Sequence, residues 1–275
     1  MFKKHFKAEH LNATEDDLQG NEEIGRYILL PGSDGRAQEI ADHFENVTVK
    51  SHSRGHNLYL GTLSCVGHPI DVAVVSTGMG CPSTEIILHE LFHLGAKRFL
   101  RIGSAGSLQP NLVKVGDLIN AQASVRDGST ACHYAPIEFP AIASLELTSS
   151  ILLAAAKLGL SDQLHTGILH CKSSLYSREF GANPLSNDNK AYIDLLIRAG
   201  VLASEMETAT LFVQSQIYNH QLKSRNGSPQ QCVLSGAILD VVGDLQHYDQ
   251  SKKMPTSIEL AIETIKTLAT QELVG

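Results

Sequence analysis

Residues 71–106 read DVAVVSTGMGCPSTEIILHELFHLGAKRFLRIGSAG, and this stretch decides the fold. An apolar run ends in the glycine-rich segment 78–80, which predicts a buried strand followed by a turn. Pro82 suits the first turn of a helix. The apolar residues that follow it recur at helical spacing: Ile86, Ile87, Leu91 and Leu94. A second apolar run ends in Gly103, so the stretch predicts strand, helix and strand in succession.

The same alternation continues over the rest of the chain. Apolar runs predict further strands at 26–32, 117–125, 166–171 and 232–242. Amphipathic stretches predict helices at 147–158, 186–199 and 256–273, and Ser186 or Asn187 is the expected N-cap of the second of these. We therefore expect an α/β fold, a single domain over residues 1–275 with a central mixed β-sheet flanked by helices. Two loops are predicted, a long one at 173–189 and a surface loop at 223–231.

The composition argues against several classes of protein. The chain has 275 residues, of which 43% are hydrophobic, so it can bury a large core. It contains no apolar run of about 18 residues and no apolar signal region, so we expect no membrane partner. The net charge is −7 and the 22 Lys and Arg residues are scattered, which argues against a nucleic-acid partner. Five dispersed cysteines predict reduced thiols and a cytoplasmic location.

Two predicted strand ends combine glycine with arginine. Gly32 follows the first strand and Arg36 lies four residues further on. Glycine lets a backbone N–H approach an anion closely, and a guanidinium can bind that anion with two hydrogen bonds. Arg101 lies within an apolar strand, with Ser104 near its end. A buried arginine needs a partner, which is either a carboxylate of the fold or a bound anion such as phosphate.

Carboxylates follow a third strand end. The segment Ser204-Glu205-Met206-Glu207-Thr208 enters an apolar helix. Carboxylates suit sugar hydroxyl groups, and Met206 can pack on an apolar sugar face. The alternative is that both acidic residues complement the helix dipole. Asp240, at the end of the last strand, is a candidate proton donor or a cap, and Asp244 competes for the same role.

Five segments together resemble the nucleoside phosphorylase family, and within it most closely the uridine phosphorylases. They are His10-Leu-Asn-Ala-Thr-Glu-Asp-Asp-Leu-Gln-Gly20, the run 76–84 (STGMGCPST), the strand 99–110 (FLRIGSAGSLQP), the segment 133–141 (HYAPIEFPA) and Glu205-Met206-Glu207. The resemblance covers roughly residues 10–270, nearly the whole chain.

This resemblance implies an activity and an assembly. The activity is a pentosyl transfer, the reversible phosphorolysis of a uridine-like pyrimidine nucleoside to a free base and ribose 1-phosphate, a reaction of pyrimidine salvage. Inorganic phosphate is the co-substrate, and neither a metal nor another cofactor is implied. The transition state has oxocarbenium character, so the enzyme stabilises a cationic sugar and a leaving base anion. The assembly is a homodimer unit, usually in a homohexamer.

The resemblance also implies roles for individual residues. The phosphate-binding residues are Gly32, Arg36, Arg101 and Ser104, with Arg54 contributed by a neighbouring subunit. The ribose-binding residues are Met206 and Glu207, with His10 contributed across the dimer to the 5′-hydroxyl group. Arg101, Glu207 and Asp240 are the expected catalytic residues. Gly55 stands where some relatives carry a glutamate of a cation site, so no metal site is expected.

The base pocket departs from the family pattern. Uridine phosphorylases carry a Gln-x-Arg pair that reads uracil, whereas this chain has Leu175-Tyr-Ser-Arg-Glu-Phe-Gly181. Tyr176, Arg178 and Phe180 are then the candidate base contacts. Asp240 is followed by Val241, a position compatible with a purine base as well. A purine nucleoside phosphorylase and a non-catalytic nucleoside-binding protein on the same fold are the alternatives.

Overall fold

The apolar runs predicted from the sequence form the strands of one sheet. The structure is a computed structural model that describes residues 6–65, 67–128, 130–223, 232–244 and 255–273. The strands are β1 (Tyr27–Pro31), β2 (Glu45–Lys50), β3 (Leu58–Cys65), β4 (His68–Val75), β5 (Arg98–Ser107), β6 (Leu118–Asp127), β7 (Ala141–Ile142), β8 (Leu164–Lys172), β9 (Ala203–Glu205) and β10 (Leu234–Asp244). The helices are α1 (Glu15–Leu18), α2 (Asp34–Ala41), α3 (Gly80–His93), α4 (Leu145–Leu158), α5 (Leu175–Phe180), α6 (Ser186–Arg198), α7 (Thr208–Lys223) and α8 (Pro255–Leu273).

The sheet is mixed, as predicted, and part of it closes on itself. Its strand order is β10-β6-β8-β9-β5-β1-β4-β3-β2, and β10 also pairs with β5. Strands β5, β10, β6, β8 and β9 therefore form a closed ring, from which β1, β4, β3 and β2 extend. Strand β1 is parallel to β4 and β5, and β10 is parallel to β5. The carboxyl ends of these four strands consequently meet at one edge of the sheet.

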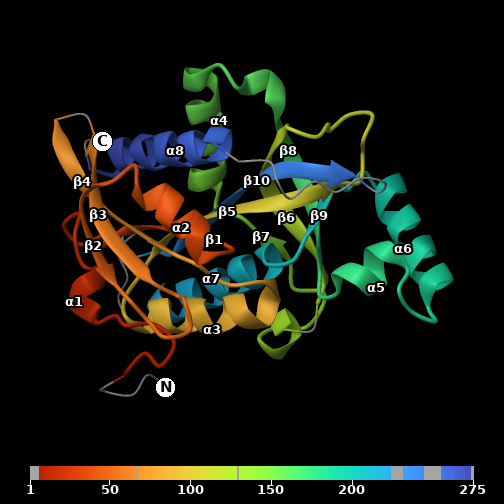
Figure 1. Ribbon diagram of the computed structural model, residues 1–275, viewed down its shortest axis with the longest axis horizontal. Helices are drawn as coiled ribbons and strands as arrows, with labels where there is room; N and C mark the ends of the chain where they lie inside the picture. Colours follow the sequence, from red (N-terminus) through yellow and green to blue (C-terminus); the bar gives the residue numbers. More distant parts are fainter. Residues whose placement is uncertain (1–5, 66, 129, 224–231, 245–254, 274–275) are drawn as a thin grey trace.

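Helices cover both faces of the sheet (Figure 1). On one face, α3 and α7 pack together, and Leu88 and Phe212 belong to the same buried cluster. On the other face lie α2, α4 and α8, whose buried residues include Ile40, Ile151 and Leu260. This arrangement confirms the predicted fold class. In the part of the chain that the structure describes, no helix is both long enough and apolar enough to cross a membrane.

The structure corrects three local predictions. The expected loop 173–189 contains α5 and the start of α6. The N-cap of α6 is Leu185, which makes no side-chain capping hydrogen bond, and not Ser186 or Asn187. The segment between β1 and β4 holds α2 and the antiparallel pair β2–β3, which the sequence analysis did not predict. Of the predicted surface loop 223–231, Lys223 ends α7, and residues 224–231 lie outside the described part of the chain.

Candidate active site

A cavity of about 340 Å³ opens at the edge where the parallel strands end. Its wall combines residues from the ends of β1, β5 and β10, from the turn between β9 and α7, and from β8 and α5. In open α/β sheets, ligands bind at the carboxyl ends of strands, and this volume lies in the range of small-molecule sites. The cavity is therefore the candidate active site.

The turn between β1 and α2 forms one end of the cavity. Gly32, Ser33 and Arg36 all line it. The backbone N–H of Arg36 donates to the Ser33 hydroxyl at 3.4 Å, so Ser33 is the N-cap of α2. Ser104, at the end of β5, lines the same wall. Four of the five predicted phosphate residues, including Arg101 described next, thus lie on one cavity wall.

Arg101 is buried within β5, with only 4% of its side chain exposed. Its guanidinium forms an ion pair with Glu207 and lies 3.6 Å from Glu205, measured from Nε to Oε2. A Cβ atom at Gly103 would lie 3.0 Å from the Arg101 guanidinium, so glycine at this position makes room for the side chain. Of the two partners considered from the sequence, a carboxylate of the fold is present, and the guanidinium still lines the cavity.

The two carboxylates of the β9–α7 turn have different surroundings. Glu205 accepts hydrogen bonds from the backbone N–H of Glu207 (2.8 Å) and of Thr208 (3.0 Å), and so caps α7. Glu207 accepts a hydrogen bond of 2.6 Å from the N–H of Gly80, which has a φ of +83°. Burial raises the pKa of Glu207, with Arg101 acting in the opposite direction. The helix-dipole alternative therefore describes Glu205, although Glu205, Met206 and Glu207 all line the cavity.

The predicted base contacts are only partly at the cavity. Phe180 lines it, but Tyr176 is 71% exposed and does not. The Arg178 guanidinium donates to Asp127 Oδ1 (2.7 Å) and Asn189 Oδ1 (2.6 Å), which directs it away from the cavity wall. The structure therefore corrects the placement of Tyr176 and Arg178 in the base pocket.

Three residues that the sequence analysis did not select as base contacts line this end of the cavity instead. They are Lys172 at the end of β8, and Leu175 and Glu179 of α5. One signal was present in the sequence, because Lys172 directly follows the predicted strand 166–171. A lysine at a buried strand end needs a partner, as Arg101 does.

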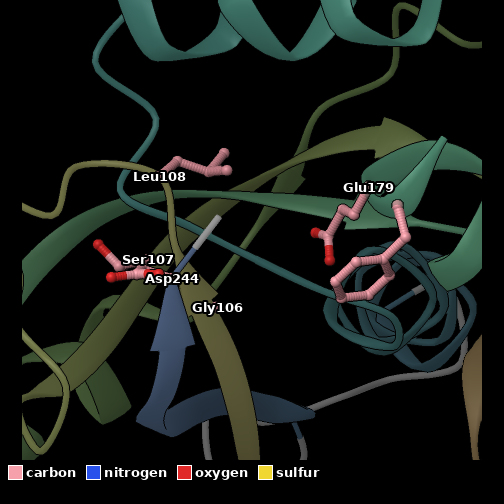
Figure 2. A pocket seen from close by; sticks show the side chains of 6 residues that line it. Gly106, Ser107, Leu108, Glu179 and Asp244 are labelled. Carbon is pink, nitrogen blue, oxygen red and sulfur yellow. The ribbon is translucent and has the colours of Figure 1, made fainter. Parts of the chain in front are cut away.

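The structure separates Asp240 from Asp244. Asp240 is buried but does not line the cavity, and the groups that act on it are Ser257 and Arg36. Asp244 does line the cavity. Figure 2 shows Asp244 at the end of β10, beside Gly106 and across from Glu179 of α5. The pairing of β10 with β5 is irregular between Val241 and Gly243, so the alternation of faces changes between the two aspartates.

His10 and Arg54, the residues predicted to come from a neighbouring subunit, do not line the cavity of their own chain. The His10 ring lies 2.8 Å from Glu90 Oε1, and Glu90 also accepts the backbone N–H groups of residues 9, 10 and 11. Arg54 is exposed in the loop between β2 and β3. Their roles stay predictions. Within the described residues, no group of three or more His, Cys, Asp or Glu side chains is arranged to hold a metal.

The fold and the cavity define a class of α/β protein whose pocket unites arginines suited to an anion with a carboxylate suited to hydroxyl groups. The sequence model of the Phosphorylase superfamily matches residues 26–222, and the chain belongs to this superfamily. A uridine phosphorylase of Treponema pallidum is 33% identical over 91% of this chain and 92% of its own length. A uridine phosphorylase of Thermococcus kodakarensis is 36% identical over 71% and 69%. A guanosine phosphorylase of Halorubrum lacusprofundi is 30% identical over 87% and 84%.

Proposed function

We propose that the protein catalyses the reversible phosphorolysis of a uridine-like nucleoside to the free base and ribose 1-phosphate. One observation carries the proposal, namely the order β8-β9-β5-β1 in the sheet. Gly32 and Arg36, which follow β1, and Arg101 of β5 therefore lie at one end of the cavity, and Glu207, after β9, lies in the middle. The residues of β8 and α5 form the other end. Phosphate, ribose and base follow in this order in the reacting complex, and the uridine phosphorylase relatives support the assignment.

The phosphate end supplies the nucleophile. Arg36 and Arg101 neutralise the phosphate charge, Ser104 offers a hydroxyl donor, and the backbone at Gly32 permits close approach. A phosphate oxygen then forms a bond to C1′ of the ribose while the C1′–N bond breaks and its electron pair leaves with the base. The anionic phosphate also stabilises the positive charge that develops on the sugar. Inorganic phosphate is the co-substrate, and no metal is assigned a step.

The ribose lies against Glu207 and Met206. The Glu207 carboxylate accepts hydrogen bonds from the 2′- and 3′-hydroxyl groups, and its negative charge favours an oxocarbenium-like transition state.

We further propose that His10 and Arg54 complete the site of a neighbouring subunit, at the 5′-hydroxyl group and the phosphate. A homodimer would then be the smallest active unit, and a homohexamer a larger assembly of it. The free cysteines fit the proposed cytoplasmic location.

The test measures base release from uridine with and without inorganic phosphate, with sulfate as the matched anion control. We expect base and ribose 1-phosphate in equal amounts, and only with phosphate. Glu207→Gln should lower kcat/KM by about 100-fold or more, the size of effect seen when one electrostatic contact to a transition state is removed. Uridine binding without any product would favour the non-catalytic alternative and overturn the proposal.

A purine nucleoside is the second candidate substrate, and Asp244 is the observation that favours it. Its side chain lines the cavity on the base side, where a carboxyl group can protonate a leaving purine base. The guanosine phosphorylase relative points the same way. Parallel assays with inosine and guanosine separate the candidates, because Asp244→Asn should lower purine turnover far more than uridine turnover.

A further inference from the structure

A buried ion pair lies on the cavity wall at the proposed base end. The Lys172 ammonium is 3.0 Å from Glu179 Oε1, and only 4% and 13% of the two side chains are exposed. Lys172 ends β8 and Glu179, seven residues further along the chain, belongs to α5, so the pair bridges a strand and a helix. Both residues line the cavity. Burying an ion pair costs free energy, so a pair buried beside a ligand cavity is a candidate for a role in ligand binding.

A chain of hydrogen bonds behind the wall fixes the lysine. Lys172 Nζ donates to the Ser204 hydroxyl at 3.0 Å, and the Ser204 oxygen lies 3.0 Å from His170 Nδ1. His170 Nε2 lies 2.8 Å from Asp127 Oδ2. Since a carboxylate only accepts, the His170 Nε2–H donates to Asp127. An ammonium only donates, so the Ser204 oxygen accepts from Lys172, and this hydrogen bond holds the ammonium in one place.

The same aspartate holds the helix that carries Glu179. Asp127 Oδ1 accepts a 2.7 Å hydrogen bond from Arg178, the neighbour of Glu179 in α5. Burial raises the pKa of Asp127, but hydrogen bonds from His170 and Arg178 outweigh it and leave the pKa below its usual value. Asp127 therefore stays ionised and ties β8 and α5 together. Lys172 and Glu179 are consequently presented to the cavity as a positioned donor and a positioned acceptor.

Glu179 keeps acceptor capacity toward the cavity. The Glu179 side chain lines the cavity and is 13% exposed, while Oε1 is itself buried and receives no directed hydrogen bond from any residue that the structure describes. An ionised carboxylate offers about four lone-pair sites, and an ammonium offers three donors. The pair can thus bind a ligand edge on which an N–H donor stands next to an acceptor oxygen.

We propose that Lys172 and Glu179 read the –NH–C(=O)– edge of the base, with Lys172 donating to the carbonyl oxygen and Glu179 accepting from the N–H group. This assignment rests on the proposed function and narrows its substrate class. Uracil, thymine, hypoxanthine and guanine carry this edge. Cytosine and adenine carry the reverse pattern, in which an unprotonated ring nitrogen adjoins an amino group. That nitrogen would face the carboxylate and the amino group would face the ammonium, so both contacts would be repulsive.

The test compares substrates that differ only at this edge. Phosphate-dependent base release is measured for uridine, cytidine and N3-methyluridine, and for inosine and adenosine. The variants are Glu179→Gln, Lys172→Met and the double variant, which removes both charges and so leaves no unpaired buried charge. The matched control is Lys157→Met/Glu263→Gln, an ion pair of 2.6 Å on the surface, where 68% of the Lys157 side chain is exposed.

We expect the wild-type protein to prefer uridine over cytidine and inosine over adenosine, and to reject N3-methyluridine. Glu179→Gln should lower kcat/KM for uridine by about 10- to 100-fold, as for the loss of a hydrogen bond to a charged group. Because a glutamine amide can turn to donate, the same variant should raise the relative rate with cytidine. If the pair had a purely structural role, the variant would lower kcat/KM equally for all substrates. The control variant should leave kcat/KM unchanged for every substrate.

The outcomes separate this proposal from the proposed function. If no nucleoside releases its base in a phosphate-dependent reaction, the proposed function fails and takes the base assignment with it. If phosphorolysis occurs but cytidine equals uridine, only the base assignment is overturned. An unchanged uridine-to-cytidine ratio in both the Glu179→Gln and the double variant also overturns it, and the phosphorylase proposal then stands.

Discussion

Asp240 provides a quantitative test of the positions of the two aspartates of β10, of which Asp240 is buried away from the cavity and Asp244 lines it. Burial raises its pKa from 3.8 to about 6, although Ser257 and Arg36 act in the opposite direction. Between these two pH values the folded protein holds a proton that the unfolded chain has lost. The free energy of unfolding should therefore fall as the pH rises from about 4 to about 6. At about 1.4 kcal/mol per pH unit, the burial of the charge costs about 3 kcal/mol above that window.

Asp240→Asn removes this penalty while keeping the shape of the side chain. At pH 8 the variant should be more stable than the wild-type protein by up to about 3 kcal/mol, whereas at pH 4 the two should be equal. Urea unfolding at a series of pH values measures the difference, with the exposed Asp162→Asn as control. A change in the free energy of unfolding that is the same at pH 4 and at pH 8 would refute the reasoning.

The activity of this variant tests the site itself. Because Asp240 does not line the cavity, Asp240→Asn should keep most of its phosphorolysis activity. Loss of turnover in a stably folded Asp240→Asn protein would restore the catalytic role that the sequence indicated for this residue.

Three further predictions follow from the buried ion pair and the proposed subunit contacts. Arg101→Met should abolish turnover and destabilise the fold by about 3–5 kcal/mol, because Glu207 is left buried and unpaired. Adding Glu207→Gln should restore most of the melting temperature but not the rate, and a double variant no more stable than the single one would contradict this. Glu90→Ala should speed hydrogen exchange of the amides of residues 9–11 by at least about 10-fold, since their shared acceptor is lost, and unchanged exchange would show otherwise. Co-expressed Arg54→Met and Arg101→Met subunits should recover about a quarter of the wild-type activity, because about half of the dimers are mixed and each mixed dimer carries one intact site of its two. No recovery would mean that Arg54 serves its own chain.

The sequence was most informative where apolar runs end in glycine. Such runs predicted β1, β4 and β5 and the helix between the last two, because burial on both faces leaves a continuous apolar pattern. The pair β2–β3 was missed for a physical reason. All but one of the residues of β2 are exposed, so this edge strand carries no apolar pattern to recognise.

Apart from Asp240, the candidate site residues that local sequence marks at or near strand ends line the cavity, and their roles stay predictions. Arg101 was selected because a charged residue in an apolar run demands a partner, and Glu207 because it is a carboxylate that follows a strand end. Lys172 and Glu179 were missed because their pairing depends on α5 folding back onto β8, which no local pattern encodes. Asp240 was chosen through the family resemblance, and alternation alone could not separate it from Asp244, because regular alternation keeps both on one face. The irregularity between Val241 and Gly243 is a tertiary feature of the pairing with β5.

The Arg101–Glu207 pair offers a way for a chain of net charge −7 to form the proposed phosphate site. In the structure each group neutralises the other, so the fold buries both at a tolerable cost. In the proposed reaction, phosphate offers Arg101 a second anion and the ribose hydroxyl groups offer Glu207 a second set of donors. Each substrate thus gives one member of the pair a new partner in place of the contact that this member loses. Phosphate and nucleoside would then bind more favourably together than singly. A single bound substrate leaves one member of the buried pair without a partner, whereas both substrates together give each member a new partner.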